Sequence, residues 1–138
     1  MFDVLTQINW IAVLIGWLVY TALGGVWFAV IVPGAYNVSL GRTRDAQPAK
    51  APIYIIGPAV CTLAITIATA ILAHALTIDA YGDALILALI VGVGYLVANT
   101  TNIAINPNFP RPLLYSLLSG VWNLVGITIV CVLIVAIG

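Results

Sequence analysis

Four long apolar runs, separated by short polar segments, account for most of the chain. Each run is close to the ~20 residues that a helix needs to cross the hydrocarbon of a bilayer, and none alternates as a half-exposed strand does. The pattern predicts transmembrane helices at residues 8–32, 53–76, 84–105 and 113–137. We therefore expect a single all-α domain over residues 1–138, a polytopic membrane protein with its four transmembrane helices in an up-down antiparallel bundle.

Composition and charge extend this picture. Of the 138 residues, 64% are hydrophobic and only 6% are charged, which excludes a water-soluble domain. Four acidic and four basic residues balance, so the chain offers no basic surface to nucleic acid and its expected partner is the lipid bilayer. The basic residues lie in the first and third loops: Arg42, Arg44, Lys50 and Arg111. Because short loops rich in Lys and Arg stay in the cytoplasm, both chain termini are predicted to lie outside.

Two stripes of small and polar residues predict how the last two helices pack. The third helix repeats such residues at spacings of three and four: Ala88, Gly92, Tyr95, Asn99, Asn102 and Asn106. The fourth helix has the same spacing at Ser116, Ser119, Asn123 and Gly126. A short turn makes the two helices antiparallel neighbours, so the stripes are predicted to face each other. The expected pairs are Asn102–Ser116, Asn99–Ser119, Tyr95–Asn123 and Gly92–Gly126.

Further polar residues complete a candidate site between the helices. Trp27 lies on the face of the first helix that is predicted to look inward, and Thr62 and Thr66 form a stripe on the second helix. Threonine hydroxyls can bond to the backbone of their own helix, and the stripe would then be simple packing. If the stripes line a cavity instead, Arg111 would stand at its cytoplasmic mouth.

The sequence contains no catalytic or metal-binding pattern. It has one histidine, no glutamate and no acid within a predicted span, so His74 lacks the further ligands that a metal needs. Ser116 and Ser119 have no neighbouring base to activate them. Proton-coupled export, as in small four-helix drug exporters, would require a carboxylate inside the membrane. We expect no enzyme, no metal and no cofactor, and we expect Cys61 and Cys131 to pack as small hydrophobic residues.

Short motifs along the chain resemble a known family. They are Asn9-Trp10, Gly24-Gly25-Val26-Trp27-Phe28, and Asn102 followed by Pro110-Arg111-Pro112-Leu113. Over nearly its whole length the chain resembles the bacterial family catalogued as domain of unknown function 1761. The resemblance implies a small integral protein of the bacterial inner membrane, without an established activity. Trp122-Asn123-Leu124 departs from the aromatic-histidine-leucine that family members often show, which weakens a catalytic histidine there.

Two functions remain open from the sequence. In the first, the polar residues are interhelical contacts, and the protein is a structural or accessory membrane subunit that recognises its partners through its lipid-facing surface. Its assembly would then be a homo-oligomer or a larger membrane complex. In the second, the stripes of helices two, three and four line a polar cavity, which binds or transports a small neutral or anionic solute. Asparagine side chains that neighbouring helices leave without partners would favour the cavity.

Overall fold

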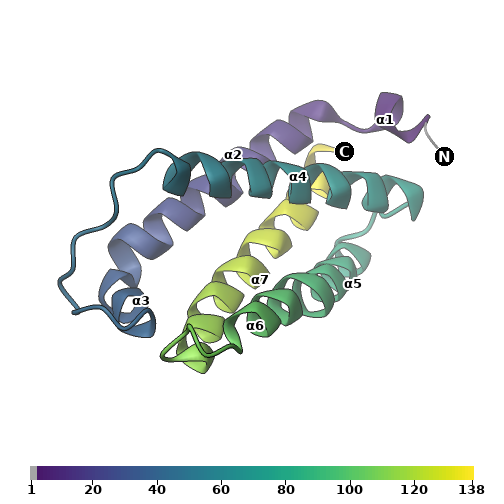
Figure 1. Ribbon diagram of the computed structural model, residues 1–138. Helices are drawn as coiled ribbons and strands as arrows, with labels where there is room; N and C mark the ends of the chain where they lie inside the picture. The colour runs from purple at the N-terminus through teal and green to yellow at the C-terminus, as the bar shows by residue number, and fades with distance from the viewer. Residues whose placement is uncertain (1–2) are drawn as a thin grey trace.

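The computed structural model describes residues 3–138, and the chain is helical apart from its loops (Figure 1). The helices are α1 Val4–Gln7, α2 Trp10–Val26, η1 Trp27–Ile31, α3 Pro33–Ser39, α4 Ile53–Ala75, α5 Tyr81–Val91, η2 Gly92–Val97, α6 Ala98–Ala104 and α7 Pro112–Ile137. Four runs are long and apolar enough to cross a membrane: Trp10–Ile31, Ile53–Ala75, Tyr81–Ala104 and Pro112–Ile137. The prediction of an all-α fold with four membrane-spanning helices is confirmed, and the described residues contain no strand.

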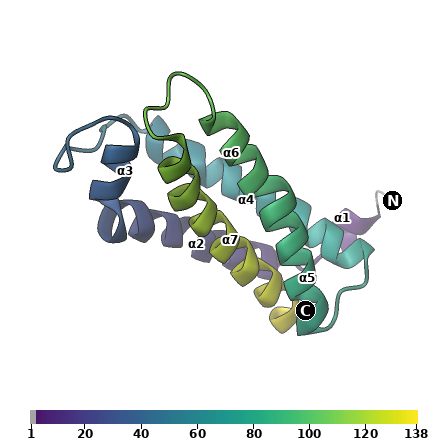
Figure 2. The ribbon, with the colours of Figure 1, turned by 90° about the horizontal axis from the view of Figure 1, so that it is seen from below.

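Helix α7 lies at the centre of the bundle. It contacts α2, α3, α4, α5, η2 and α6. Figures 1 and 2 show it between the first membrane crossing, Trp10–Ile31, and the third, Tyr81–Ala104. Its buried face is rich in small and short polar residues, namely Ser116, Ser119, Gly120, Asn123 and Gly126. Short side chains let neighbouring backbones come close. Several helices can therefore pack against α7 at once.

Asn9 joins the start of α2 to the end of α7. Its Oδ1 accepts hydrogen bonds from the backbone N–H groups of Ile11 (3.0 Å) and Ala12 (3.2 Å), which caps the first turn of α2. Its Nδ2 donates to the carbonyl of Ile137 at 3.3 Å, at the end of α7. A single asparagine thus satisfies backbone groups at two helix ends, which would otherwise lack partners.

The first and third crossings each contain a π-helical turn. These turns are η1, after α2, and η2, between α5 and α6. A π turn closes i→i+5 hydrogen bonds and so holds one residue more than an α turn. Because one residue of an α-helix corresponds to about 100° of rotation, every residue after the wide turn faces a different direction from the one that α-helical spacing predicts.

Helix α4 packs across α2 and α7 with its threonine face inward. Thr62, Thr66 and Thr69 are all buried, with exposed fractions of 2% or less. Pro58 lies inside the first turns of α4, so the helix continues through the proline instead of beginning after it. The outward face of α4 is aliphatic, as in the exposed Ile55 and Val60.

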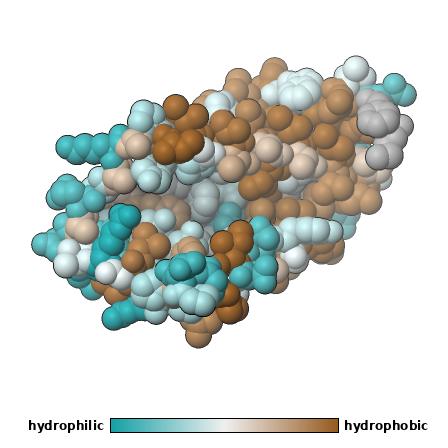
Figure 3. All heavy atoms as spheres, in the orientation of Figure 1, coloured by the Kyte–Doolittle hydropathy of each residue, from teal (hydrophilic) through white to brown (hydrophobic). Residues whose placement is uncertain are grey.

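The surface separates into an apolar body and a polar end. In Figure 3 hydrophobic residues cover the upper and right part of the molecule, and hydrophilic residues gather at the left and lower left. That end contains the loop 40–52 and the turn 105–111 in Figure 1, and the hydrophilic surface continues over α6. The apolar body is suited to contact with the lipid bilayer.

Candidate functional site

A buried hydrogen-bond network joins three crossings. The hydroxyl of Tyr20, on α2, donates to Asn123 Oδ1, on α7, at 2.8 Å. Asn123 Nδ2 in turn donates to Thr100 Oγ1, on α6, at 3.4 Å. Tyr20 is 0% exposed and Asn123 is 7% exposed, so these polar groups depend on one another for hydrogen bonds. Asn123 was predicted as an interhelical contact, and Tyr20 lies on the face of the first helix that was predicted to look inward, but Thr100 was not among the predicted residues.

An aromatic column continues from this network toward the polar end of the molecule. Its six residues contact one another in the order Tyr20, Trp122, Phe28, Tyr36, Tyr115 and Phe109, with ring centroids 4.7–5.9 Å apart. Gly24 leaves room for the indole, because a Cβ there would lie 3.0 Å from it. Trp122 Nε1 is buried without a hydrogen-bond partner among the described residues. At the loop end, burial first and then the neighbouring Tyr115 raise the pKa of Tyr36 above its usual value.

Two further tryptophans of the first crossing bond to backbone carbonyls of other helices. Trp27 Nε1 donates to the carbonyl of Leu118, on α7, at 3.0 Å. Trp17 Nε1 donates to the carbonyl of Ala59, on α4, at 2.8 Å. The bond of Trp27 to Leu118 agrees with the inward placement predicted for Trp27. Both tryptophan bonds hold α2 and η1 against their neighbours.

Most hydroxyls of the predicted site are satisfied by their own helices. Thr66 donates to the carbonyl of Thr62, and Ser116 donates to the carbonyl of Pro112, each at 2.8 Å. Thr62 lies 2.8 Å from the hydroxyl of Thr21 on α2 and also donates to Ala59. Ser119 is buried, 5% exposed. Back-bonding to the preceding turn of the same helix explains how the hydroxyls of Thr62, Thr66 and Ser116 tolerate burial.

The face that the third helix was predicted to turn toward the fourth is wrong in its second half. Tyr95 is 68% exposed, and Asn99 and Asn102 are also exposed, so none of the three faces α7. Up to the first residue of η2 the predicted face is correct, because Ala88 and Gly92 are buried. The wide turn of η2 then rotates the stripe outward and brings the next residues of the helix, Val97 and Thr100, onto α7 instead.

The two glycines of the expected Gly92–Gly126 pair do not contact each other. A Cβ on Gly92 would lie 2.7 Å from the side chain of Leu124, whereas a Cβ on Gly126 would overlap the ring of Tyr20. Gly126 therefore serves the packing of α2 against α7. Gly92, at the start of η2, lies against Leu124 and Ile127 of α7.

The remaining residues of the predicted site belong to the turn before α7. The side chain of Asn106 donates to the carbonyl of Ile103 and accepts from the N–H of Asn108 at 2.8 Å. This local bonding closes the end of α6 and needs no cavity. Arg111 is exposed immediately before α7.

The rotated residues form a distinct surface, which we call the asparagine face. It consists of Gly94, Tyr95, Ala98, Asn99 and Asn102, which line a shallow open hollow together with Leu96. The side-chain hydrogen bonds of α6 and the turn after it are made by Thr100 and Asn106, and none among the described residues involves Tyr95, Asn99 or Asn102. The face thus presents polar groups without partners on the outside of a membrane span.

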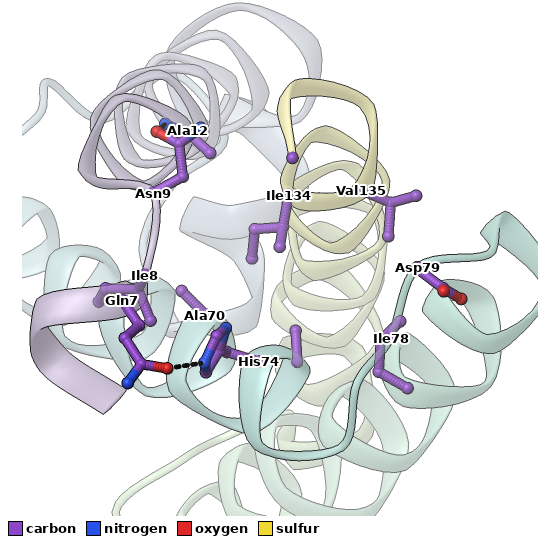
Figure 4. A pocket seen from close by; sticks show the side chains of 12 residues that line it. Gln7, Ile8, Asn9, Ala12, Ala70, His74, Ile78, Asp79, Ile134 and Val135 are labelled. Carbon is purple, nitrogen blue, oxygen red and sulfur yellow. Dashed lines mark hydrogen bonds between the residues drawn. The ribbon is translucent and has the colours of Figure 1, made fainter. Parts of the chain in front are cut away.

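A second hollow lies at the opposite end of the bundle, where α1 and the ends of α4 and α7 meet (Figure 4). Its volume is about 270 Å³, and its floor includes Ala12, Ala70 and Ile134. His74 Nε2 lies 3.1 Å from Gln7 Oε1 at its rim. Within residues 3–138, no three His, Cys, Asp or Glu side chains are grouped so that they could hold a metal ion. Cys131 packs in the core as expected, whereas Cys61 is exposed on α4.

Comparison with known proteins gives one match. The model of a family described as "Protein of unknown function (DUF1761)" matches residues 11–135. This confirms the resemblance seen in the sequence motifs. No curated protein and no solved structure matches the chain.

Proposed function

The chain belongs to the DUF1761 family of proteins of unknown function, and from that premise we propose that it is a non-enzymatic accessory subunit that binds another transmembrane helix through its asparagine face. The observation that carries the proposal is the exposure of Tyr95, Asn99 and Asn102 within a membrane span. By contrast, Thr66 of α4 and Asn123 of α7 are buried and hydrogen-bonded.

The depth of the asparagine face makes its exposure costly in lipid. The span ends at Ala104, so a rise of 1.5 Å per residue puts the Cα atoms of Asn99 and Tyr95 about 8 Å and about 14 Å from its end. Where this part of the span lies in hydrocarbon, water cannot replace the missing hydrogen-bond partners. A second helix packed on this face would supply them, at a gain of about 0.6–2 kcal/mol for each bond.

Binding or transport of a small neutral or anionic solute has less support. That function needs the polar residues of α4, α6 and α7 to converge on one cavity. In the structure Thr62 and Thr66 lie against α2, while Asn99 and Asn102 lie on the outer surface. The asparagines that would favour a cavity are without partners, but they point away from the bundle interior.

Replacement of both asparagines should release the partner helix. For Asn99→Leu combined with Asn102→Leu, we expect about 30-fold weaker association, from about 1 kcal/mol for each amide. The size of complexes containing the protein can be measured by native electrophoresis after mild solubilisation of membranes. Asn108→Leu is the matched control, because Asn108 lies in the turn outside the span. A wild-type protein that migrates as a monomer, or a double variant that migrates like the wild type, would contradict the proposal.

The proposed setting is the bacterial inner membrane with both termini outside. In the structure a Cβ on Gly41 would lie 2.9 Å from the Pro110 side chain, so the first and third loops, with all four basic residues, meet at one end. At the other end, Asp79 lies in the loop before α5 and Asp83 lies in the first turn of α5. An excess of basic residues marks the cytoplasmic side.

Labelling of single cysteines tests this orientation. In a background with Cys61→Ala and Cys131→Ala, a membrane-impermeant thiol reagent applied to intact cells should label Gly82→Cys and leave Thr43→Cys unlabelled. Both positions are exposed, Thr43 in the first loop and Gly82 in the first turn of α5, so their accessibility differs only through the membrane. The reverse pattern would show that the basic loops face outward; permeabilised cells, in which both should react, serve as the control.

A further inference from the structure

We infer that the helix bound by the asparagine face belongs to a second copy of this chain, so that the protein is a parallel two-fold dimer. This inference rests on the proposed function and names its partner. In the dimer η2 and α6 of one copy lie against η2 and α6 of the other, with the two-fold axis along the membrane normal.

Self-complementary hydrogen bonding is the first argument for a second copy. Copies inserted with the same orientation place identical residues at the same depth, and a two-fold axis between them brings each residue opposite its equivalent. A carboxamide has both donors and an acceptor, and a phenol hydroxyl can also do both. Asn99 can therefore bond to Asn99 of the second copy, and Asn102 and Tyr95 are suited in the same way.

The shape of the face permits the close approach that such bonds need. A Cβ on Gly94 would meet nothing within 4 Å, and Ala98, one helical turn later, is exposed beside it. Small residues four positions apart on a membrane helix allow two backbones to pack closely. The small residues of the hollow beside Tyr95 and Asn99 thus leave room for the same helix of a second copy.

Charge does not oppose the dimer. Asp83 is the one acid or base in the span Tyr81–Ala104, and it lies at the opposite end of the span from Asn99. Outward-facing residues of α2 and α4, such as Leu18 and Ile55, are aliphatic and match lipid. The asparagine face is consequently the surface of the described spans that gains most from a polar partner, and the second copy offers one without repulsion.

Cysteine crosslinking tests the dimer directly. We expect Ala98→Cys, in a background with Cys61→Ala and Cys131→Ala, to form a covalent dimer on mild oxidation in native membranes, because a disulfide needs Cα atoms about 4.4–6.8 Å apart. Ala64→Cys is the matched control, as it replaces an exposed alanine within the span of α4. Co-expression of two copies with tags of different mass identifies the product, which should carry both tags.

The possible outcomes separate the dimer from the proposed function. A product with both tags at Ala98→Cys and none at Ala64→Cys supports the dimer. If Ala98→Cys gives no such product while Asn99→Leu with Asn102→Leu still reduces the size of the native complex, the face binds a different helix and the dimer is wrong. If neither experiment gives an effect, both the dimer and the proposed function are overturned.

Discussion

Gly126→Ala is expected to destabilise the bundle by about 1–3 kcal/mol, the usual cost of overpacking a filled interior. The added methyl group would overlap Cε2 and Cδ2 of the Tyr20 ring. That ring has no free space to enter, because Tyr20 is 0% exposed, its hydroxyl is bonded to Asn123, and its centroid is 5.3 Å from the ring of Trp122. Separation of α2 from α7 would be the way to relieve the overlap. Gly126→Leu should therefore be worse than Gly126→Ala.

Gly25→Ala provides the control for this effect. Gly25 lies in α2, and a Cβ there would meet nothing within 4 Å. Since alanine is favoured over glycine within a helix by up to about 1 kcal/mol, this variant should be as stable as the wild type or more stable. Thermal unfolding in detergent ranks the two variants. Equal unfolding temperatures would mean that the Tyr20 ring can move away, contrary to the packing described.

Loss of the Asn123 amide should be the second large effect. Asn123→Leu leaves the hydroxyl of Tyr20 buried without its acceptor, at an expected cost of about 1–2 kcal/mol. Tyr20→Phe removes the donor instead and leaves the amide oxygen without a partner. In the double variant both groups are absent, so the combined loss of stability should be smaller than the sum of the two single losses.

A double-mutant cycle measures this coupling. The free energies of unfolding of the wild type, both single variants and the double variant can be obtained by denaturant titration in mixed micelles, with an expected coupling of about 0.6–1.7 kcal/mol. Ser116→Ala combined with Tyr20→Phe is the control pair, because the Ser116 hydroxyl bonds to its own helix at Pro112. That pair should be additive. Additivity of Asn123→Leu with Tyr20→Phe would show that the hydrogen bond contributes nothing.

The sequence was sufficient to predict the four spans and part of their packing. Long apolar runs fix the helices because a membrane allows few alternatives to a helix. The threonine stripe of α4 was predicted either to pack against neighbouring helices or to line a cavity. In the structure Thr62 and Thr66 lie in packed contacts. Trp27 and Asn123 also bond to neighbouring helices, as interhelical contacts should.

The face presented by the second half of the third crossing could not be predicted. α-helical spacing relates Gly92 to Asn99 and Asn102, and this relation fails only because η2 holds an additional residue. Gly92 and Gly94 make the helix locally permissive, but glycines occur equally in regular membrane helices. Gly92 lies against Leu124 and Ile127 of α7, and such contacts between helices are not contained in any local pattern.

The aromatic column gives the protein a built-in optical signal of its tertiary structure. Rings held in fixed, tilted contact, from Tyr20 through Trp122 and Phe28 to Phe109, absorb in an asymmetric environment and contribute to circular dichroism in the near ultraviolet. That signal disappears when side-chain packing is lost, even where the helices themselves persist. Separation of α2 and α3 from α7 can thus be followed without any attached dye, independently of the far-ultraviolet signal of the helices.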